Sequence, residues 1–321
     1  MNIIGISAYH HDSAAAYIKD RYIHSASHEE RFSRVKYDKR FPERTLRWMR
    51  KQQEQIDGVV FYEHKNFKDR QSIKRDIKKT LPGKYPIEFV EHHDSHAMSA
   101  ILTTDWEECA VMVVDSVGGK YATSLGIYNN RQITWLKRFE YPNSLGLFYS
   151  TITRFLGFTP LMDEEKIMSA AAYGDSKWVP YAKEKLIRTE FGNYEILEDL
   201  RRGIGVGPLD WDIAASAQSI LQECLVNLAG WLQKETGLYK LAYAGGVALN
   251  CVANTHLCQF TNFNDIAIQP AAGDAGCALG AAALIERPLW EGPFLGFEDS
   301  LYQNPEDIAF KILQNEIVPV I

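Results

Sequence analysis

The chain repeats one order of secondary structure, and this repetition limits what it can fold into more than any other feature. Each copy of the pattern begins with three short strands joined by tight turns and continues with helices and strands in alternation. The first copy runs through residues 2–104, and the second begins at Cys109. A β-β-β-α-β-α-β-α order given twice predicts an α/β protein with two related lobes.

The expected elements follow from apolar periodicity and from turn and capping residues. In the first copy we predict strands at 2–8, 14–18, 21–27, 57–62 and 86–90, and helices after Pro42, at 67–80 and from His92 onward. In the second copy we predict strands at 109–115, 122–128, 132–139, 239–244 and 265–268, and helices at 145–156, 212–236, 247–258 and 275–285. The stretch to about 210 is less regular. We assign residues 1–104 to a first lobe, 105–286 to a second, and 287–321 to a tail with a short helix near 305–316.

Two such lobes are typical of duplicated ribonuclease-H-like lobes of the sugar-kinase/actin/Hsp70 (ASKHA) type, an architecture that binds nucleotide phosphates. A matching loop is present at Gly245-Gly246-Val247, between a strand and a helix. Glycines there let the backbone approach a phosphate, and the helix N-terminus supplies N–H donors. Asn250 and Asn254 are four residues apart and could face the same ligand, although capping explains Asn254 equally well.

A histidine pair opens the last helix of the first lobe. His92 and His96 are four residues apart in Glu91-His92-His93-Asp94-Ser95-His96, so that on a helix they share one face. This is the spacing with which two imidazoles hold one metal ion. Two ligands do not make a site, and a pair of histidines at a helix start is the simpler interpretation.

Two carboxylates could complete the ligand set. Asp115 ends an apolar strand before a glycine turn, and Asp274 begins the helix at 275–285. Each has a purely structural explanation, as a turn former and as a helix N-cap respectively. Together with the histidine pair they form a set of two imidazoles and two carboxylates drawn from both predicted lobes. Mixed nitrogen and oxygen ligation with open positions suits Fe(II), Mn(II) or Zn(II).

A third group of polar residues lies in the turn between the first two strands. His11 is next to Asp12 and Ser13, and a histidine in that setting could act as a general base for a hydroxyl group. A hydrogen-bonded turn without catalytic work is the alternative. Neither a G-x-S-x-G elbow nor a Walker-type phosphate loop occurs in the sequence.

Charge and cysteine content further limit the partners and the cellular compartment that we expect. Residues 1–90 hold 19 Lys and Arg against 12 Asp and Glu, although the whole chain has a net charge of −6. This surplus fits either solvated helix faces or a lobe that meets phosphate. An odd count of 5 cysteines without a C-x-x-C motif favours a reduced, cytoplasmic compartment. No apolar run approaches the ~18 residues of a membrane span, and we expect no membrane partner.

The motifs taken together resemble the O-carbamoyltransferase family that tailors antibiotics and nodulation factors. The resemblance extends over nearly the whole chain in the same order. It rests on H-D-S-A-A-A at 11–16, E-E-R-F-S-R-V-K-Y-D-K-R-F-P at 29–42, H-H-D-S-H-A at 92–97, D-E-E-K-I-M-S-A-A-A-Y-G at 163–174, G-G-V-A-L-N at 245–250 and P-A-A-G-D-A-G at 270–276.

The resemblance implies transfer of a carbamoyl group from carbamoyl adenylate, which such proteins make from carbamoyl phosphate and ATP, to an acceptor hydroxyl. It assigns an Fe(II)-type metal to His92, His96, Asp115 and Asp274. It assigns the nucleotide to Gly245, Gly246, Val247 and Asn250, together with Gly273 and Lys166. His11, with Asp12 beside it, becomes the expected base. The acceptor would be a small molecule or a hydroxymethyl group on a nucleobase, and nucleic acid is a conceivable carrier although no nucleic-acid motif is present.

Two departures from the family pattern affect these expectations. After the strand that ends at Asp115, the chain reads Ser116-Val117-Gly118-Gly119-Lys120 and lacks the acidic residue that the family usually has there. Family members also continue into a YrdC-like domain that forms carbamoyl adenylate. The present sequence ends at Ile321, which leaves three interpretations: a fragment of a longer chain, a separate YrdC-like protein that makes the activated intermediate, or a fold that acts differently without this domain.

Two other functions remain open at this stage. The tRNA threonylcarbamoyl-transferase family is similar in architecture, in its histidine pair and in a G-G-V-A-x-N loop. Against it, the E-E-R-F…F-P block is absent from that family, which typically has Glu-Gly before the last histidine. A nucleotide-binding scaffold without catalysis is the alternative from a different class.

Overall fold

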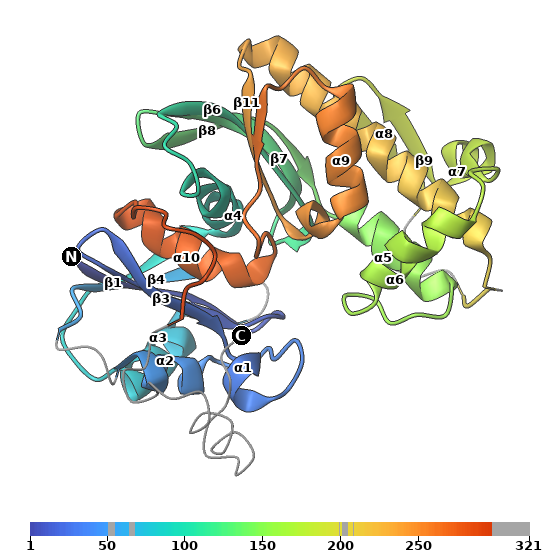
Figure 1. The fold of residues 1–321 in the computed structure, drawn as a ribbon. Coiled ribbons are helices and arrows are strands. Elements are labelled where there is room, and N and C mark those ends of the chain that lie inside the picture. The colour runs from blue at the N-terminus through green and yellow to red at the C-terminus, as the bar shows by residue number, and fades with distance from the viewer. Residues whose placement is uncertain (51–54, 64–67, 199, 201–204, 208, 297–321) are drawn as a thin grey trace, which may run out of the picture. The chain divides into compact units, whose positions relative to one another are not determined.

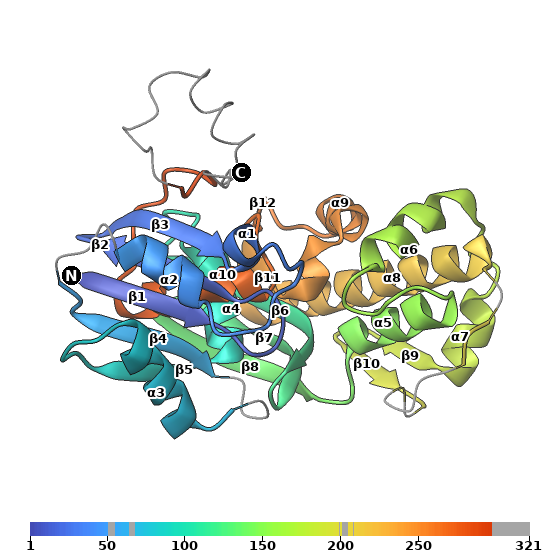
Figure 2. The same ribbon diagram turned by 90° about the horizontal axis from the view of Figure 1, so that it is seen from below.

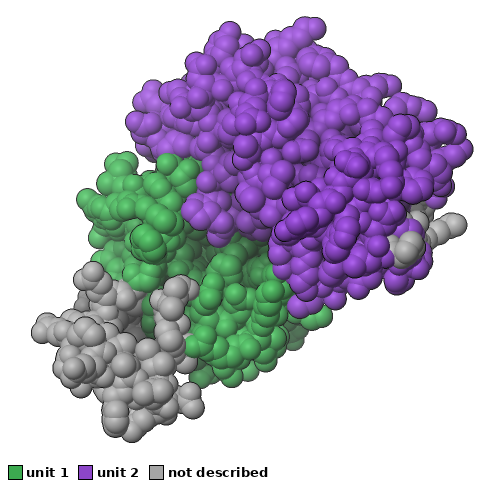
Figure 3. All heavy atoms as spheres, turned by 45° about the vertical axis from the view of Figure 1, so that its right-hand side comes forward, with its two compact units in different colours: residues 1–103, 274–321 green, residues 104–273 purple. Residues whose placement is uncertain are grey.

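The computed structural model describes residues 1–50, 55–63, 68–198, 200, 205–207 and 209–296. It forms two compact units, which Figure 3 distinguishes by colour. Unit 1 contains residues 1–103 and the chain from Asp274 onward, and unit 2 contains residues 104–273. The last described helix thus belongs to unit 1, whereas we predicted it as part of the second lobe.

Unit 1 is built on a five-stranded sheet in the order β3-β2-β1-β4-β5. Its strands are β1 (Asn2–Ser7), β2 (Ala14–Lys19), β3 (Tyr22–His28), β4 (Gly58–Glu63) and β5 (Ile87–Glu91). The first three pair antiparallel, while β4 and β5 run parallel to β1. Asp20 and Arg21 join β2 to β3 with φ of 49° and 70°, as a two-residue hairpin turn requires.

Helices cover both faces of this sheet (Figure 1). They are α1 (Glu30–Ser33), α2 (Glu43–Arg50), α3 (Arg70–Thr80), α4 (His92–Ile101) and α10 (Asp274–Ile285). α4 and α10 pack against each other on one face, and α2 and α3 lie on the other. α10 is apolar on nearly every side after its first residue, and nine of its residues are buried. A helix apolar all round must be enclosed by other elements, which explains why α10 is in the interior of unit 1.

Unit 2 repeats the same sheet, in the order β12-β11-β6-β7-β8. Its strands are β6 (Glu108–Gly118), β7 (Tyr121–Asn129), β8 (Gln132–Glu140), β11 (Lys240–Ala244) and β12 (Asp265–Ala267). Three consecutive strands are again antiparallel, and the last two run parallel to the first. Asn130 and Arg131 make the same hairpin turn, with φ of 50° and 64°. The predicted duplication is therefore present in strand order, direction and turn type.

The helices of unit 2 surround a separate apolar core. They are α5 (Leu145–Phe155), α6 (Glu164–Ala170), the 3₁₀ turn η1 (Ala171–Tyr173), α7 (Val179–Lys185), α8 (Trp211–Thr236), the 3₁₀ turn η3 (Gly246–Leu249) and α9 (Cys251–Phe260). A small hairpin of β9 (Ile187–Glu190) and β10 (Asn193–Ile196) lies beside α7 and α8 (Figure 2). The stretch that we predicted as less regular thus contains several short elements.

Two predicted helices differ from the structure or lie outside it. The helix predicted at 247–258 is divided, because the Asn250 side chain accepts a hydrogen bond from the Ala253 N–H at 2.9 Å and begins α9 anew. The helix predicted near 305–316 lies outside the described residues. Among the described helices, none combines the length and apolar character needed to cross a bilayer.

Candidate functional site

The two histidines of α4 point to one place in the interior of unit 1. β5 ends at Glu91, the N-cap of α4, so that His92 occupies the first turn and His96 the next. Both side chains are fully buried, and their Nε2 atoms are 3.0 Å apart. The predicted sharing of one helix face is confirmed.

Close backbone packing brings α10 to these histidines. A Cβ atom added to Gly280 would be 1.9 Å from the carbonyl oxygen of Ser95 in α4. A Cβ atom added to Gly5 would be 1.8 Å from the carbonyl oxygen of Ala278 in α10. Only glycine permits both approaches, because any side chain would collide with backbone. α10 is therefore held between β1 and α4, with its first residue, Asp274, beside the histidines.

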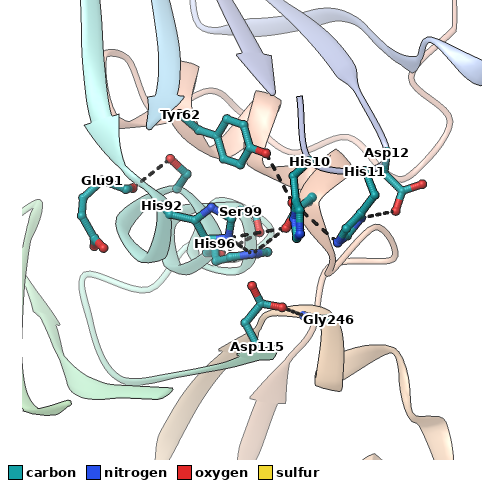
Figure 4. Close-up of polar contacts among 12 residues, drawn as sticks. His10, His11, Asp12, Tyr62, Glu91, His92, His96, Ser99, Asp115 and Gly246 are labelled. Atoms are coloured by element: carbon teal, nitrogen blue, oxygen red, sulfur yellow. Dashed lines mark hydrogen bonds and ion pairs between the residues drawn. The ribbon is translucent and has the colours of Figure 1, made fainter. Parts of the chain in front are cut away.

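Asp274 is the centre of the cluster, and Figure 4 labels the side chains that contact it, which are His10, Tyr62, His92 and His96. Its Oδ1 is 3.4 Å from His92 Nε2 and 3.3 Å from His96 Nε2. Its Oδ2 is 3.1 Å from His10 Nδ1 and 3.3 Å from the Tyr62 hydroxyl, which donates to it. Burial alone would raise the pKa of Asp274, but the nearby His11 and His92 and hydrogen bonds from His10 and His92 hold that pKa well below its usual range.

This donor set fits a divalent metal. Oδ1 of Asp274 is buried, and its nearest nitrogens are the Nε2 atoms of His92 and His96, at 3.4 and 3.3 Å, longer than the usual hydrogen-bond distance. Ligands about 2.0–2.1 Å from one ion and at right angles to each other are about 3 Å apart, close to the separations of these three atoms. The 3.0 Å contact between the two rings also fits an N–H···N hydrogen bond, which requires a proton that a metal would displace.

A sulfur atom lies in the same group. Cys277 is buried one helical turn after Asp274, and its Sγ together with one ligand atom from each of His92, His96 and Asp274 forms a set within 4.8 Å of one another. His10, His11 and Asp274 form a second such set, which shares the carboxylate. The side chains of unit 1 therefore offer nitrogen, oxygen and sulfur donors around one carboxylate.

The turn between β1 and β2 supplies the candidate base. His11 Nδ1 is 2.8 Å from Asp12 Oδ2, and its Nε2 is 3.8 Å from Asp274 Oδ2. With the Nδ1 proton donated to Asp12, the lone pair of the ring is on Nε2, as a base requires. Tyr9 and Asp12 have φ of 77° and 51°, a left-handed conformation that is uncommon for residues with side chains. Such strain persists where the surroundings enforce it, often at functional sites.

The remaining predicted ligand and the glycine loop belong to unit 2. Asp115 is buried near the end of β6, and its Oδ1 accepts a hydrogen bond from the Gly246 N–H at 3.2 Å. Gly245 has φ of 99°, and a Cβ atom there would be 2.2 Å from the Val114 carbonyl oxygen. The loop that we predicted to hold phosphate is thus anchored to the strand that carries Asp115, with Val247 in the 3₁₀ turn after it.

The other residues predicted for nucleotide binding have local partners in unit 2. Asn250 exchanges two hydrogen bonds with Gln218, at 3.1 and 2.9 Å, in addition to capping α9. Lys166 is paired with Asp163 at 2.6 Å on the surface of α6. Gly273 is the last residue of the unit, where an added Cβ would touch Leu249 at 3.4 Å. Their nucleotide contacts stay predictions.

Three contributors to the cluster were not assigned from the sequence. His10 stands next to His11 in the motif, yet the expected role went to His11 alone. Tyr62 is near the end of β4, where alternation of strand side chains could have directed it inward. Cys277 is three residues after Asp274, and the helical spacing places both on one side of α10.

Solved structures share the fold of this chain. HypF of T. kodakarensis matches with a TM-score of 0.56 and 14% identity, over 89% of this chain and 48% of that one. Component A of (R)-2-hydroxyglutaryl-CoA dehydratase from Acidaminococcus fermentans matches with a TM-score of 0.51 and 13% identity, over 89% and 98% of the two chains. At such identities the likeness concerns the fold alone. It confirms the predicted sugar-kinase/actin/Hsp70 (ASKHA) class with duplicated ribonuclease-H-like lobes.

The sequence comparisons then establish the family. The model for the carbamoyltransferase N-terminus matches residues 2–85, 72–188 and 182–283, and the chain belongs to this family. The uncharacterised protein sll1178 of Synechocystis sp. is 34% identical over 88% of this chain and 56% of its own length. The nodulation protein NolNO of Sinorhizobium fredii is 29% identical over 96% of this chain and 51% of its own. The chain spans about half the length of these relatives.

Proposed function

We propose that this chain carries the transfer site of an O-carbamoyltransferase. The observation that supports it most is the junction of the Asp274 cluster with the His11–Asp12 pair inside unit 1, in a chain of the carbamoyltransferase N-terminus family. The proposed donor is carbamoyl adenylate, formed from carbamoyl phosphate and ATP. The proposed acceptor is a hydroxyl group on a small molecule or on a nucleobase hydroxymethyl group.

The reaction exchanges one carbon–oxygen bond for another. The acceptor oxygen attacks the carbamoyl carbon, the bond from that carbon to the phosphate oxygen breaks, and AMP leaves with the electron pair. His11 accepts the proton of the acceptor hydroxyl on Nε2, while Asp12 holds Nδ1 and stabilises the resulting imidazolium. A positioned base of this kind contributes ~10²–10⁴-fold to the rate.

The chain's own residues would also bind the metal ion and the nucleotide phosphate that the reaction needs. His92, His96 and Asp274, with Asp115 as the predicted fourth ligand, would bind Fe(II) or a similar divalent metal. When bound, such an ion supplies a positive charge that polarises a carbonyl or phosphoryl oxygen. Backbone N–H groups of the Gly245-Gly246-Val247 loop would bind the nucleotide phosphate. The YrdC-like activity that makes the adenylate would come from a separate protein or from another part of a longer chain.

We place the reaction in the cytoplasm. All five cysteines are free thiols in the structure, and two of them, Cys251 and Cys258, are exposed. Exposed thiols of this kind persist in compartments kept reduced by glutathione and thioredoxin. Detection of the native protein in the soluble, reducing fraction of gently lysed cells would support this assignment, and intermolecular disulfides in freshly isolated protein would contradict it.

The test is a transfer assay with labelled carbamoyl phosphate, ATP, Fe(II) and a YrdC-like protein. Sugar, macrolide and hydroxymethyl-nucleotide acceptors are offered in parallel, and products are identified by mass spectrometry. We expect a carbamate ester, and a His11→Asn variant should be ~10²–10⁴-fold slower while it retains its metal. A His256→Asn variant, altered on α9 of unit 2, serves as the matched control and should react at the wild-type rate.

Two results would replace this proposal. Formation of threonylcarbamoyladenosine on tRNA, when threonine and bicarbonate are supplied in place of carbamoyl phosphate, would favour the tRNA-modifying alternative. Stoichiometric ATP binding with no transfer to any acceptor, even when carbamoyl adenylate is generated in the assay, would identify a nucleotide-binding scaffold.

A further inference from the structure

A pocket of about 520 Å³ opens on unit 1 directly beside the Asp274 cluster. The turn at Tyr9 and His10 forms one wall, residues 39–43 form another, and the end of α3 forms a third. His10 connects the pocket to the cluster, since its Nδ1 is 3.1 Å from Asp274 Oδ2. Its volume is within the range of about 300–1,000 Å³ that is common for small-molecule sites. A ligand here would contact His10, whose ring centroid is 4.3 Å from that of the candidate base His11.

Positive charge predominates among the side chains that line the pocket. Four are cationic and two are carboxylates: Lys39, Arg40, Lys68 and Lys79, against Glu43 and Asp76. Lys68 is paired with Asp76, and Arg40 with Asp38 at 2.5 Å. Lys39 and Lys79 form no ion pair with any residue that the structure describes. Lys39 and Lys79 are therefore available to pair with an anionic ligand. A neutral sugar would not need such pairing.

An aromatic wall adjoins these cations. The rings of Tyr9 and Phe41 are stacked with centroids 6.1 Å apart and an interplanar angle of 29°. Tyr9 is fixed at both ends, since its hydroxyl donates to Asp76 at 2.6 Å and its N–H donates to the Lys39 carbonyl oxygen at 2.9 Å. Aromatic side chains held in this way suit a planar ring, as base-stacking sites in nucleic-acid-binding proteins show. The pocket thus combines contacts for a planar ring with contacts for an anion.

We propose that this pocket binds the carbamoyl acceptor and that the acceptor is a nucleotide. Its phosphate would contact Lys39 and Lys79, its base would lie against Tyr9 and Phe41, and its hydroxyl group would face His10 and His11. This inference rests on the proposed carbamoyl transfer, and it names the substrate class. The products would be the carbamoylated nucleotide and AMP, and the acceptor proton would go to His11.

The binding test compares three probes by titration calorimetry on the full chain. They are 5-hydroxymethyl-2′-deoxycytidine monophosphate, the same nucleoside without phosphate, and a short oligonucleotide that contains it. We expect the monophosphate to bind and the nucleoside to bind at least ~10-fold more weakly, because it lacks the charged contacts. Binding of the oligonucleotide alone would overturn the assignment to a free nucleotide, as would equal affinity for the nucleoside and the monophosphate.

Variants locate the site. A Lys39→Ala/Lys79→Ala double variant should bind the monophosphate at least ~10-fold more weakly, with the affinity for the nucleoside unchanged. Both side chains are exposed, so the fold does not depend on them. Lys74→Ala is the matched control, because it removes the same charge from α3 outside the pocket and should leave both affinities unchanged. An unchanged affinity in the double variant would overturn the proposal.

The outcome also separates this inference from the proposed function. Rapid carbamoyl transfer to a neutral sugar, at wild-type kcat/KM in the double variant, would support the transferase and overturn the nucleotide pocket. Phosphate-dependent binding of the nucleotide that the double variant loses, together with no transfer to any acceptor, would support the pocket as a nucleotide site and overturn the transferase.

Discussion

Units 1 and 2 have the same sheet but bury different side chains. In both, three antiparallel strands precede two parallel ones, and a two-residue turn with positive φ joins the second strand to the third. Within the described residues, unit 1 buries Glu29, Asp38, His92, His93, His96 and Asp274, whereas Asp115 is the buried Asp, Glu or His of unit 2. Burying such groups costs free energy unless they are paired or bind a metal. The shared topology therefore supports two units of very different chemistry.

The difference arises at the turn that follows the first strand of each sheet. After β1, this turn contains His10, His11 and Asp12, two of which contact Asp274. Near the end of β6, Asp115 accepts a hydrogen bond from a backbone N–H, and the turn itself is Gly119-Lys120, between the paired Gly118 and Tyr121. The apolar pattern of the strands determines the sheet. The few residues at the strand ends determine whether a unit offers titratable side chains or backbone N–H donors.

Removing an imidazole from unit 1 should have the largest effect. We expect His92→Ala or His96→Ala to abolish stoichiometric Fe(II) binding, because each takes one nitrogen from a buried set of donors. Metal content is measured by inductively coupled plasma spectrometry after equilibrium dialysis. His256→Ala in unit 2 is the control and should bind as wild type does. If either α4 variant still binds one equivalent of iron, the site is elsewhere.

A side chain at Gly280 should disrupt the close packing of α10 against α4 in unit 1. Gly280→Val places a side chain against the Ser95 carbonyl, and we expect unit 1 to lose at least about 2 kcal/mol of unfolding free energy along with metal affinity. In Gly230→Ala, on α8 of unit 2, the new Cβ meets only the Phe191 ring at 3.3 Å. That control should change stability by no more than about 1 kcal/mol. Urea unfolding monitors both variants, and equal effects would contradict the tight packing of α10.

Asp115→Asn tests whether unit 2 contributes a ligand. The amide keeps an oxygen for the Gly246 N–H, so the fold should be unchanged, while the charge is removed. We expect metal affinity to fall at least ~10-fold, less than in the histidine variants. A competition titration with a fluorescent chelator measures this. Wild-type affinity in the variant would restrict the donors to unit 1.

The smallest expected effect is on the loss of folding stability at low pH. Hydrogen bonds from Arg40 hold the pKa of Asp38 well below its usual range, despite the opposing effect of burial. The unfolded chain therefore takes up this proton at higher pH than the folded one, and the stability from this pair is present above about pH 4 and lost as the pH falls below it. Thermal unfolding between about pH 6 and pH 3 should show a shallower acid decline in Asp38→Asn. Parallel declines in both proteins would exclude this pair as the cause.

Elements with strong local signals could be predicted from the sequence. The strand predicted at 109–115 and the helix predicted at 212–236 agree with β6 and α8, because their patterns and caps suffice to specify them. The helix predicted at 247–258 was too long, because a side-chain cap at Asn250 interrupts it. Capping competes with continuation of the helix, and periodicity alone does not show which prevails.

The site could be predicted only in part. The spacing of His92 and His96 follows from helical geometry, and their meeting with Asp274 is confirmed. The contacts of Tyr62 and Cys277 depend on how closely α10 approaches the sheet and α4, which is decided by Gly5 and Gly280. Those glycines leave no periodic signal, so the sequence gives their positions but not the long-range packing that they permit.

The position of Asp274 in the chain has a consequence for biosynthesis. Unit 1 is discontinuous: its strands are made first, but α10 follows the whole of unit 2. During translation, α4 is therefore synthesised before Asp274 and before the glycine-bearing helix that packs against it. The imidazoles of α4 lack both until the second half of the molecule has emerged from the ribosome. A polypeptide that terminates before Asp274 lacks this carboxylate. At the proposed site, metal loading would thus report that synthesis has passed the whole of unit 2.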